Sequence, residues 1–138
     1  MDDLVERDGI HYKKFSDVPF TGGVEGLDQG FMREGIRVGR WILYHENGEI
    51  FGEGNYRKGK KWDLWTFHFS NGGLYKKGDF INDKEEGFFI QYRENGQLHS
   101  KGNYKNGFKE GRWFNYTETG NLYRYESGVF KNGLKISD

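Results

Sequence analysis

The sequence predicts an all-β protein, an elongated and twisted single-layer antiparallel meander of stacked β-hairpins. Three observations lead to this prediction. The chain repeats every 24 residues, it is rich in glycine and aromatic residues, and Asn-Gly or related pairs recur between its apolar segments. A fixed period of this length is typical of stacked units that cannot bury their apolar faces alone.

One aromatic position and one glycine position mark the repeat most clearly. They are filled by Trp41, Trp65, Phe89 and Trp113, and by Gly54, Gly78 and Gly102. In the fourth copy the equivalent glycine, Gly128, comes two residues late, so this copy carries a two-residue insertion. We expect the marked positions to form the structural core of the repeat, because each buried ring removes roughly 150–250 Å² from water.

Composition argues against helices and disulfides. The 138 residues include 22 glycines, one proline and 18% aromatic residues, and they include no alanine. Glycine weakens helices, and aromatic residues favour pleated surfaces. The chain has no cysteine, which excludes a disulfide framework and thiolate metal ligands.

Each copy is predicted to be a hairpin. In the first full copy, residues 40–46 and 49–57 are the strands and Asn47-Gly48 is a two-residue type I′ turn, which needs positive φ at both positions. This register places Trp41 opposite Gly54, so that the ring covers a glycine on its partner strand. It also places four aliphatic residues on the Trp face: Ile50, Leu74, Leu98 and Leu122. A three-residue loop would exchange these faces, unless its glycine is absorbed as a bulge.

A second set of turns is predicted at the opposite sheet edge. These turns are Glu34-Gly35, Lys58-Gly59, Asn82-Asp83, Asn106-Gly107 and Asn132-Gly133. Asp83 replaces the glycine of the third turn, and Asp63 replaces the glycine expected before Trp65. We expect both replacements to loosen the chain locally.

The length predicts a single domain, within which three parts differ in pattern. Residues 1–20 are predicted to be an N-terminal strand and cap, residues 21–133 the hairpin repeats, and residues 134–138 a C-terminal tail. Within the cap, residues 9–14 are expected to form a strand and residues 15–19 a turn or edge. Repeat arrays need such a cap to shield an open sheet edge.

The sequence predicts no catalytic, metal or cofactor site, and we expect no enzymatic activity. The four histidines do not recur at one repeat position, so they form no evenly spaced set of metal ligands. Asp83, Glu85 and Glu86 form a cluster, but a single-layer sheet offers no cleft in which carboxylates would oppose each other. A solvated turn is therefore the favoured interpretation of this cluster.

Charge and the first residues bear on partners and location. Lys and Arg number 21, and Asp and Glu number 21, so no net field favours nucleic acid or an anionic membrane. The start MDDLVERDG is acidic where a signal peptide would be basic and then apolar. We expect a cytoplasmic protein. The sequon Asn115-Tyr116-Thr117 is interpreted as a chance match.

The face opposite the tryptophans is expected to bind a protein partner. A single-layer sheet cannot hide both faces, and mixed tyrosine and charge is typical of protein-binding surfaces. Variable turns on a constant framework are also places where partner choice can be encoded. The candidate interface residues are Tyr44, Phe51, Tyr75, Tyr92, Tyr116, Asp83, Glu85 and Glu86.

The unit GRWILYHENGEIFGEGNYRKGK, residues 39–60, resembles a MORN-type repeat variant. The opening residues 9–14 and 19–22 resemble the start of bacterial YwqK-type antitoxin proteins that carry such repeats. The resemblance implies stacked hairpins, no catalysis, and a role as a protein-interaction or immunity scaffold whose partner is a toxin. Two alternatives stay open: a peripheral membrane-associated MORN scaffold, and a carbohydrate-binding aromatic sheet.

Overall fold

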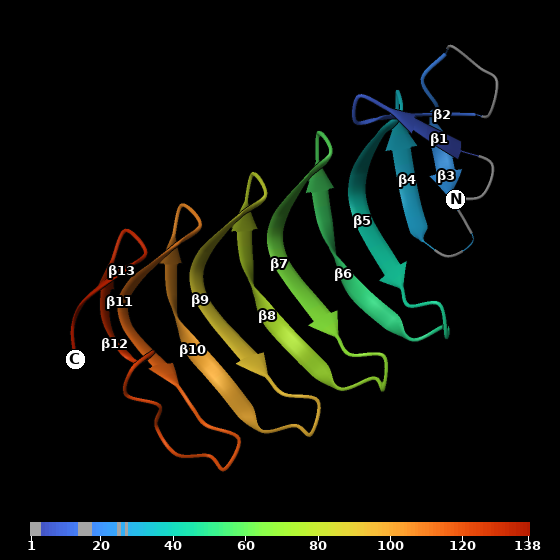
Figure 1. Ribbon diagram of the computed structural model, residues 1–138. Helices are drawn as coiled ribbons and strands as arrows, with labels where there is room; N and C mark the ends of the chain where they lie inside the picture. The colour runs from blue at the N-terminus through green and yellow to red at the C-terminus, as the bar shows by residue number, and fades with distance from the viewer. Residues whose placement is uncertain (1–3, 14–17, 25, 27) are drawn as a thin grey trace.

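The computed structural model describes residues 4–13, 18–24, 26 and 28–138, and in these residues all regular secondary structure is β. The strands are β1 (Leu4–Arg7), β2 (Ile10–Lys13), β3 (Gly22–Val24), β4 (Gln29–Arg33), β5 (Ile36–Tyr44), β6 (Ile50–Arg57), β7 (Lys60–His68), β8 (Leu74–Ile81), β9 (Lys84–Tyr92), β10 (Leu98–Lys105), β11 (Phe108–Asn115), β12 (Gly128–Lys131) and β13 (Leu134–Ser137). Strands β3 to β13 form one antiparallel sheet in sequence order, and β1 and β2 form a separate hairpin (Figure 1). The predicted meander is confirmed. In this described part of the chain, no helix has the length and apolarity needed to cross a membrane.

The turns at one edge of the sheet are two-residue type I′ turns, as at Lys58-Gly59. Both central residues have positive φ, +48° and +79°, and Arg57 pairs directly with Lys60. The turn stacks on the preceding unit, because the amide of Gly59 donates to the carbonyl of Arg37 at 3.0 Å. Four more predicted turns have the same φ signs: Glu34-Gly35, Asn82-Asp83, Asn106-Gly107 and Asn132-Gly133.

Both aspartates that replace an expected glycine adopt the left-handed backbone conformation, and each makes a hydrogen bond or ion pair through its side chain. Asp83 has φ +71°, and its carboxylate accepts a hydrogen bond from the amide of Lys61 at 2.7 Å. Asp63 has φ +63°, and its carboxylate forms an ion pair with Arg57 at 3.2 Å. Aspartate tolerates this region better than most residues. The side-chain bonds therefore compensate for the lost glycines.

The Asn-Gly turns at the other edge differ from the prediction. At Asn47-Gly48 only Gly48 has positive φ, +90°. The amide of Gly48 donates to the carbonyl of His45 at 3.0 Å, and the amide of His45 donates to the carbonyl of Glu49 at 2.8 Å. This is a three-residue loop, a type I turn followed by a glycine bulge. The predicted type I′ turn was wrong here, because the Asn47 side chain holds the turn instead, accepting from the Glu49 amide at 3.0 Å.

The longer loop exchanges the faces of the residues beside it. Tyr44 pairs with Ile50, whereas Leu43 pairs with Gly52, so Phe51 is an extra residue in its strand. Ile50 therefore lies on the face opposite Trp41, and the prediction that it shares the Trp face was wrong. Its equivalents pair in the same way: Leu74 with His68, Leu98 with Tyr92 and Leu122 with Tyr116. Beyond the bulge, the predicted pairing of Trp41 with Gly54 is confirmed.

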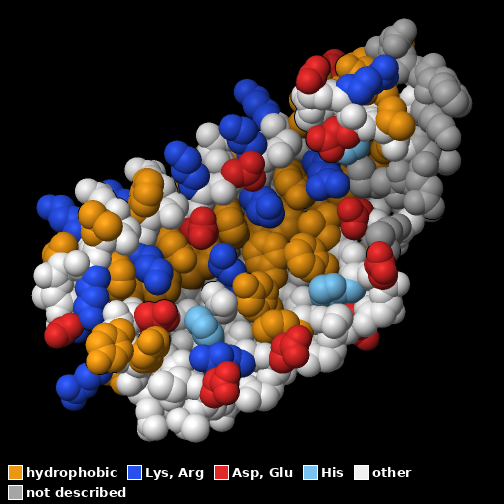
Figure 2. Space-filling model, in the orientation of Figure 1, with side chains coloured by type: hydrophobic (Ala, Val, Ile, Leu, Met, Phe, Trp, Pro, Cys, Tyr) orange, Lys and Arg blue, Asp and Glu red, His pale blue; other side chains and the backbone are white. Residues whose placement is uncertain are grey.

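Each long strand bends two residues before its core ring. The bending residues are Gly39, Asp63, Gly87 and Gly111, with φ between +63° and +82°. The ladder is interrupted there: Glu53 pairs with Thr66, whereas Asn55 pairs with Trp62. The bends curve the strands of the sheet (Figure 1). The tryptophans are buried, so the Trp face is the inside of the resulting trough. Figure 2 shows hydrophobic side chains gathered in its hollow, with Lys and Arg side chains along it.

Each core ring covers a glycine of the preceding unit rather than of its own hairpin. A Cβ placed on Gly54 would lie 2.3 Å from the ring of Trp65. The indole Nε1 of Trp65 also donates to the carbonyl of Asn55 at 2.9 Å. The other ring and glycine pairs are Trp41 with Gly30, Phe89 with Gly78 and Trp113 with Gly102. This corrects the predicted cover within one hairpin and shows that the rings join consecutive units.

The residues predicted to form the repeat core are buried. Trp41 and Trp65 are 0% exposed, and Phe89 and Trp113 are 2% and 3% exposed. The glycines that they cover, including Gly54, Gly78 and Gly102, are buried or half-buried beneath them. A curved single layer thus encloses its tryptophans without a second sheet.

The two ends of the chain complete the sheet in different ways. Among the residues predicted as an N-terminal strand, β2 is formed, and the amide of His11 donates to the carbonyl of Gly35 at 2.7 Å. Phe20 packs against the core, whereas residues 15–17 of the predicted turn lie outside the described residues. The segment 134–138, expected to be a tail, contributes β13, which pairs with β12.

Candidate functional site

The trough has a floor of alternating, edge-to-face rings. Tyr56 and Trp65 are 5.0 Å apart between ring centroids, and Phe89 and Tyr104 are 5.2 Å apart. Tyr104 continues the series to Trp113 at 4.9 Å. Edge-to-face packing of this kind stabilises aromatic cores beyond the area that they bury. The floor is therefore a rigid base whose rings are mostly inaccessible.

Four aromatic side chains rise from this floor on the concave side, and we call them the aromatic lip: Phe51, Phe67, Phe69 and Tyr75. The ring of Phe67 stacks on that of Trp65 with 5.8 Å between ring centroids, and it packs against the ring of Phe51 with 6.0 Å between centroids. Phe69 and Tyr75 contact each other at 4.8 Å. Phe51 is 42% exposed, and the other three are half-buried. The lip presents apolar surface to the inside of the trough.

Cations lie over the core rings along the trough. Arg37 lies over Trp41, Lys61 over Trp65 and Lys109 over Trp113, at 4.9, 5.5 and 4.8 Å from the ring centroids, respectively. In the third unit Glu85 takes this position and forms an ion pair with Lys76 at 3.7 Å. The Lys76 ammonium then lies 5.4 Å from the Phe89 centroid. Each core ring thus carries a cation, in the geometry of a cation–π contact.

Burial sets the protonation of the trough's titratable rings. Burial raises the pKa of Tyr56, and the neighbouring Arg37, which donates to its hydroxyl at 3.2 Å, partly opposes this. Burial likewise raises the pKa of Tyr104. Burial lowers the pKa of His99, and the charge of Arg93 lowers it further. At neutral pH the two tyrosines and His99 are therefore uncharged, and the fixed charges of the trough come from Lys, Arg and carboxylates.

Two of the histidines, His45 and His68, contact backbone carbonyls at the turns. The Nε2 of His45 lies 2.8 Å from the carbonyl of His68, and the Nδ1 of His68 lies 3.3 Å from the carbonyl of Gly72. Among the residues that the structure describes, no group of three or more His, Cys, Asp or Glu could hold a metal ion. The chemistry that the trough offers is apolar contact and cationic charge.

The predicted interface residues do not form one surface. Tyr44, Tyr92 and Tyr116 pair with the Ile50-type residues on the convex face and are half-buried. Phe51 and Tyr75, expected on that same face, lie inside the trough instead. The reason is the bulge after the three-residue loop, which turns these two side chains to the Trp face.

The predicted acidic cluster supports the turns of the sheet. Asp83 accepts from the amide of Lys61, and Glu86 accepts from the amide of Asn106 at 2.8 Å. Glu85 forms its ion pair with Lys76. The three carboxylates are thus engaged within the framework, and they lie apart from the tyrosines of the convex face.

Sequence reasoning missed the cations and two of the lip residues. Arg37, Lys61 and Lys109 share one repeat position, so their spacing was a usable signal. Phe67 and Phe69 carried no comparable signal, because Gln91 and Arg93 fill the equivalent positions of the next copy.

Two segments of the chain, residues 37–58 and 85–106, match the family described as MORN repeat variant. Each segment covers one hairpin, β5–β6 and β9–β10, in the same phase of the repeat. No curated protein matches the chain. The matches support the resemblance to MORN-repeat proteins, and they carry no information about the antitoxin resemblance. The chain is thus a repeat protein, and two of its hairpins are similar to the MORN repeat variant.

Proposed function

We propose that the protein is a non-enzymatic scaffold that binds a protein partner in its trough. The observation that carries this proposal is the aromatic lip, where Phe51 is 42% exposed beside Phe67 and above a rigid ring floor. Exposed aromatic groups on a preorganised surface are typical of the anchor sites in protein interfaces. The MORN-type repeats also support a binding scaffold.

The charges of the trough favour a partner segment with an apolar side chain flanked by carboxylates. Among the described residues, Lys61 and Lys109 have no carboxylate partner within ion-pair distance. Their ammonium groups lie over the ring floor, at Trp65 and Trp113 respectively. The carboxylates of an acidic segment would pair with both ammonium groups, and an apolar side chain would pack beside Phe51.

A retention experiment with matched variants tests the use of the trough. Immobilised wild-type protein is compared with Phe51→Ser/Tyr75→Ser and with Leu64→Ser/Phe88→Ser, using lysate of the source organism. Leu64 and Phe88 are 44% and 55% exposed and precede core rings, so they lie on the convex face. We expect one partner to be retained by the wild type and the convex variant and lost from the trough variant. Loss only from the convex variant would contradict the use of the trough.

We further propose that the partner is a bacterial toxin and that the protein neutralises it in the cytoplasm. The resemblance of residues 9–14 and 19–22 to antitoxin proteins supports this. The test is to express a toxin encoded beside this gene in a bacterial host, alone and with each variant above. Growth restored by the wild type and the convex variant, but not by the trough variant, is the expected result. If the wild type did not restore growth, the antitoxin role would be contradicted. The retention experiment would still test protein binding separately.

The two alternatives from the sequence stand differently. Carbohydrate stacking on the tryptophans loses its basis, because Trp41 and Trp65 are 0% exposed. Peripheral membrane association stays a prediction, and sedimentation with anionic liposomes tests it.

A further inference from the structure

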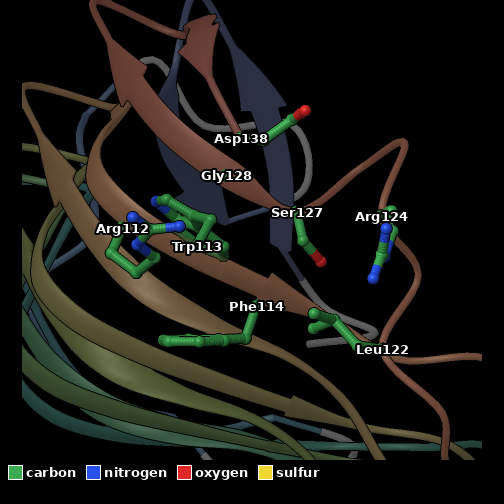
Figure 3. Close-up of a pocket in the computed structure, with 8 residues that line it drawn as sticks. All are labelled: Arg112, Trp113, Phe114, Leu122, Arg124, Ser127, Gly128 and Asp138. Carbon is green, nitrogen blue, oxygen red and sulfur yellow. The ribbon is translucent and has the colours of Figure 1, made fainter.

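The convex face carries a pocket of about 170 Å³ at the C-terminal end of the sheet (Figure 3). Its apolar walls are Phe114 of β11 and Leu122 of the segment between β11 and β12. Arg112 and Arg124 lie on its two sides. The pocket opens on the face opposite the trough, because Arg112 and Phe114 flank Trp113 in the strand and face away from its ring, although Trp113 also lines the pocket.

The insertion of the fourth copy builds one wall of this pocket. Residues 123–127 form a turn in place of the first part of the return strand. The amide of Asn115 donates to the Ser127 hydroxyl at 2.9 Å, and that hydroxyl donates to the Asn115 carbonyl at 3.1 Å. Ser127 is 6% exposed and Asn115 is 4% exposed, so this link is sheltered from water. The wall is therefore held firmly against β11.

Within the part of the chain that the structure describes, neither arginine of the pocket is held by a direct bond to a carboxylate. Among the described residues, neither the Arg112 nor the Arg124 guanidinium makes a hydrogen bond or ion pair. Arg40, which occupies the repeat position of Arg112, instead forms an ion pair with Glu53 at 3.3 Å. The carboxylate of Asp138 also lines the pocket and feels the charge of Arg124, but it forms its ion pair with the Lys135 ammonium at 2.9 Å and points away from Phe114 and Leu122 (Figure 3). The pocket therefore combines apolar walls with two guanidinium groups that make no direct hydrogen bond or ion pair within the described residues.

We propose that this pocket binds a carboxylate carried on an apolar group. Guanidinium groups pair with carboxylates through charge-assisted hydrogen bonds, and Phe114 and Leu122 receive the apolar group. The carboxylate comes from the C-terminal residue of a peptide or from a free organic acid. The proposal is independent of partner binding in the trough, so either can fail without the other.

The test is a titration with 3-phenylpropionate, monitored by the amide NMR signals of Phe114, Leu122 and Arg124. The uncharged control ligand is 3-phenylpropionamide, which has the same apolar stem. We expect the acid to shift these signals with a Kd on the order of 1 mM, and the amide to leave them unchanged. Arg112→Gln and Arg124→Gln should each weaken binding by about 3–10-fold, whereas Arg40→Gln should not change it.

The outcomes separate the proposal from its competitors. Equal binding of acid and amide would show an apolar pocket without charge recognition and would overturn the proposal. The proposal would also be overturned if the acid did not shift the amide NMR signals at a concentration 20-fold above the expected Kd. Binding of the acid that is unchanged in both arginine variants would overturn it as well. The tripeptide Gly-Gly-Phe distinguishes the two sources, because a peptide terminus predicts binding at least as tight as that of the free acid. Binding of the free acid alone supports a small-molecule ligand.

Discussion

The ring of Trp65 lies so close to Gly54 that a Cβ on this glycine would be 2.3 Å from it. Gly54 belongs to the hairpin before Trp65, so the contact joins two units. The indole also donates to the neighbouring carbonyl of Asn55 at 2.9 Å. Stability in such an array depends on interfaces between neighbouring units, and both residues of this contact are buried.

Gly54→Ala should destabilise the protein by about 1–3 kcal/mol, because the added methyl group forces Trp65 from its place. Urea unfolding followed by tryptophan fluorescence measures the change. Gly23→Ala is the control, since a Cβ at Gly23 meets nothing within 4 Å, and it should change stability by less than about 0.5 kcal/mol. Equal effects of the two substitutions would contradict the close contact.

Trp65→Phe should lower the free energy of unfolding by about 1–3 kcal/mol, because the carbonyl of Asn55 loses its buried donor. Phe89 naturally occupies the same position without a donor, so Phe89→Leu serves as a control that reduces the volume of the buried side chain and removes no hydrogen bond. Thermal unfolding of both variants gives the comparison. An unchanged midpoint for Trp65→Phe would show that the indole bond does not contribute.

Glu46→Pro should be tolerated, with a change below about 0.5 kcal/mol. Glu46 is the second residue of the type I turn that begins at His45, a position that favours proline. In a two-residue type I′ turn at Asn47-Gly48, Glu46 would instead be a paired strand residue and proline would remove its amide donor. A loss of several kcal/mol in urea unfolding would therefore favour the type I′ turn over the observed one.

Acid should destabilise the protein partly through His99. Its folded-state pKa is lowered, by burial first and by Arg93 second, so the unfolded chain takes up the proton more readily. This contribution is complete above the ordinary histidine pKa of about 6.5 and is lost as pH falls through the lower folded value. His99→Gln should flatten the fall in melting temperature between about pH 7 and 5. A parallel fall in both proteins would exclude His99 as a cause.

Much of the fold could be predicted, because hairpins, turn positions and the pairing of Trp41 with Gly54 follow from the period. The type of the turn at Asn47-Gly48 could not be predicted, because Asn-Gly is compatible with both a type I′ turn and a type I turn with a glycine bulge. Because of this ambiguity, Ile50 and Phe51 were each assigned to the wrong face of the sheet. The residues of the predicted interface therefore lie on different faces in the structure. The curvature of the sheet was also not predicted. It comes from residues with positive φ within strands, such as Gly39 and Asp63, and an alternating pattern of apolar and polar residues does not reveal them.

The position of a bound partner tests the central claim most directly. The chain has no cysteine, so His99→Cys and Leu64→Cys each introduce a single thiol, one in the trough outside the aromatic lip and one on the convex face. The rate of thiol labelling is measured with and without the protein that the wild type retains, held at about ten times its Kd for each variant. Binding in the trough predicts labelling about tenfold slower at position 99 and unchanged at position 64. Protection at position 64 with free labelling at position 99 would contradict the account.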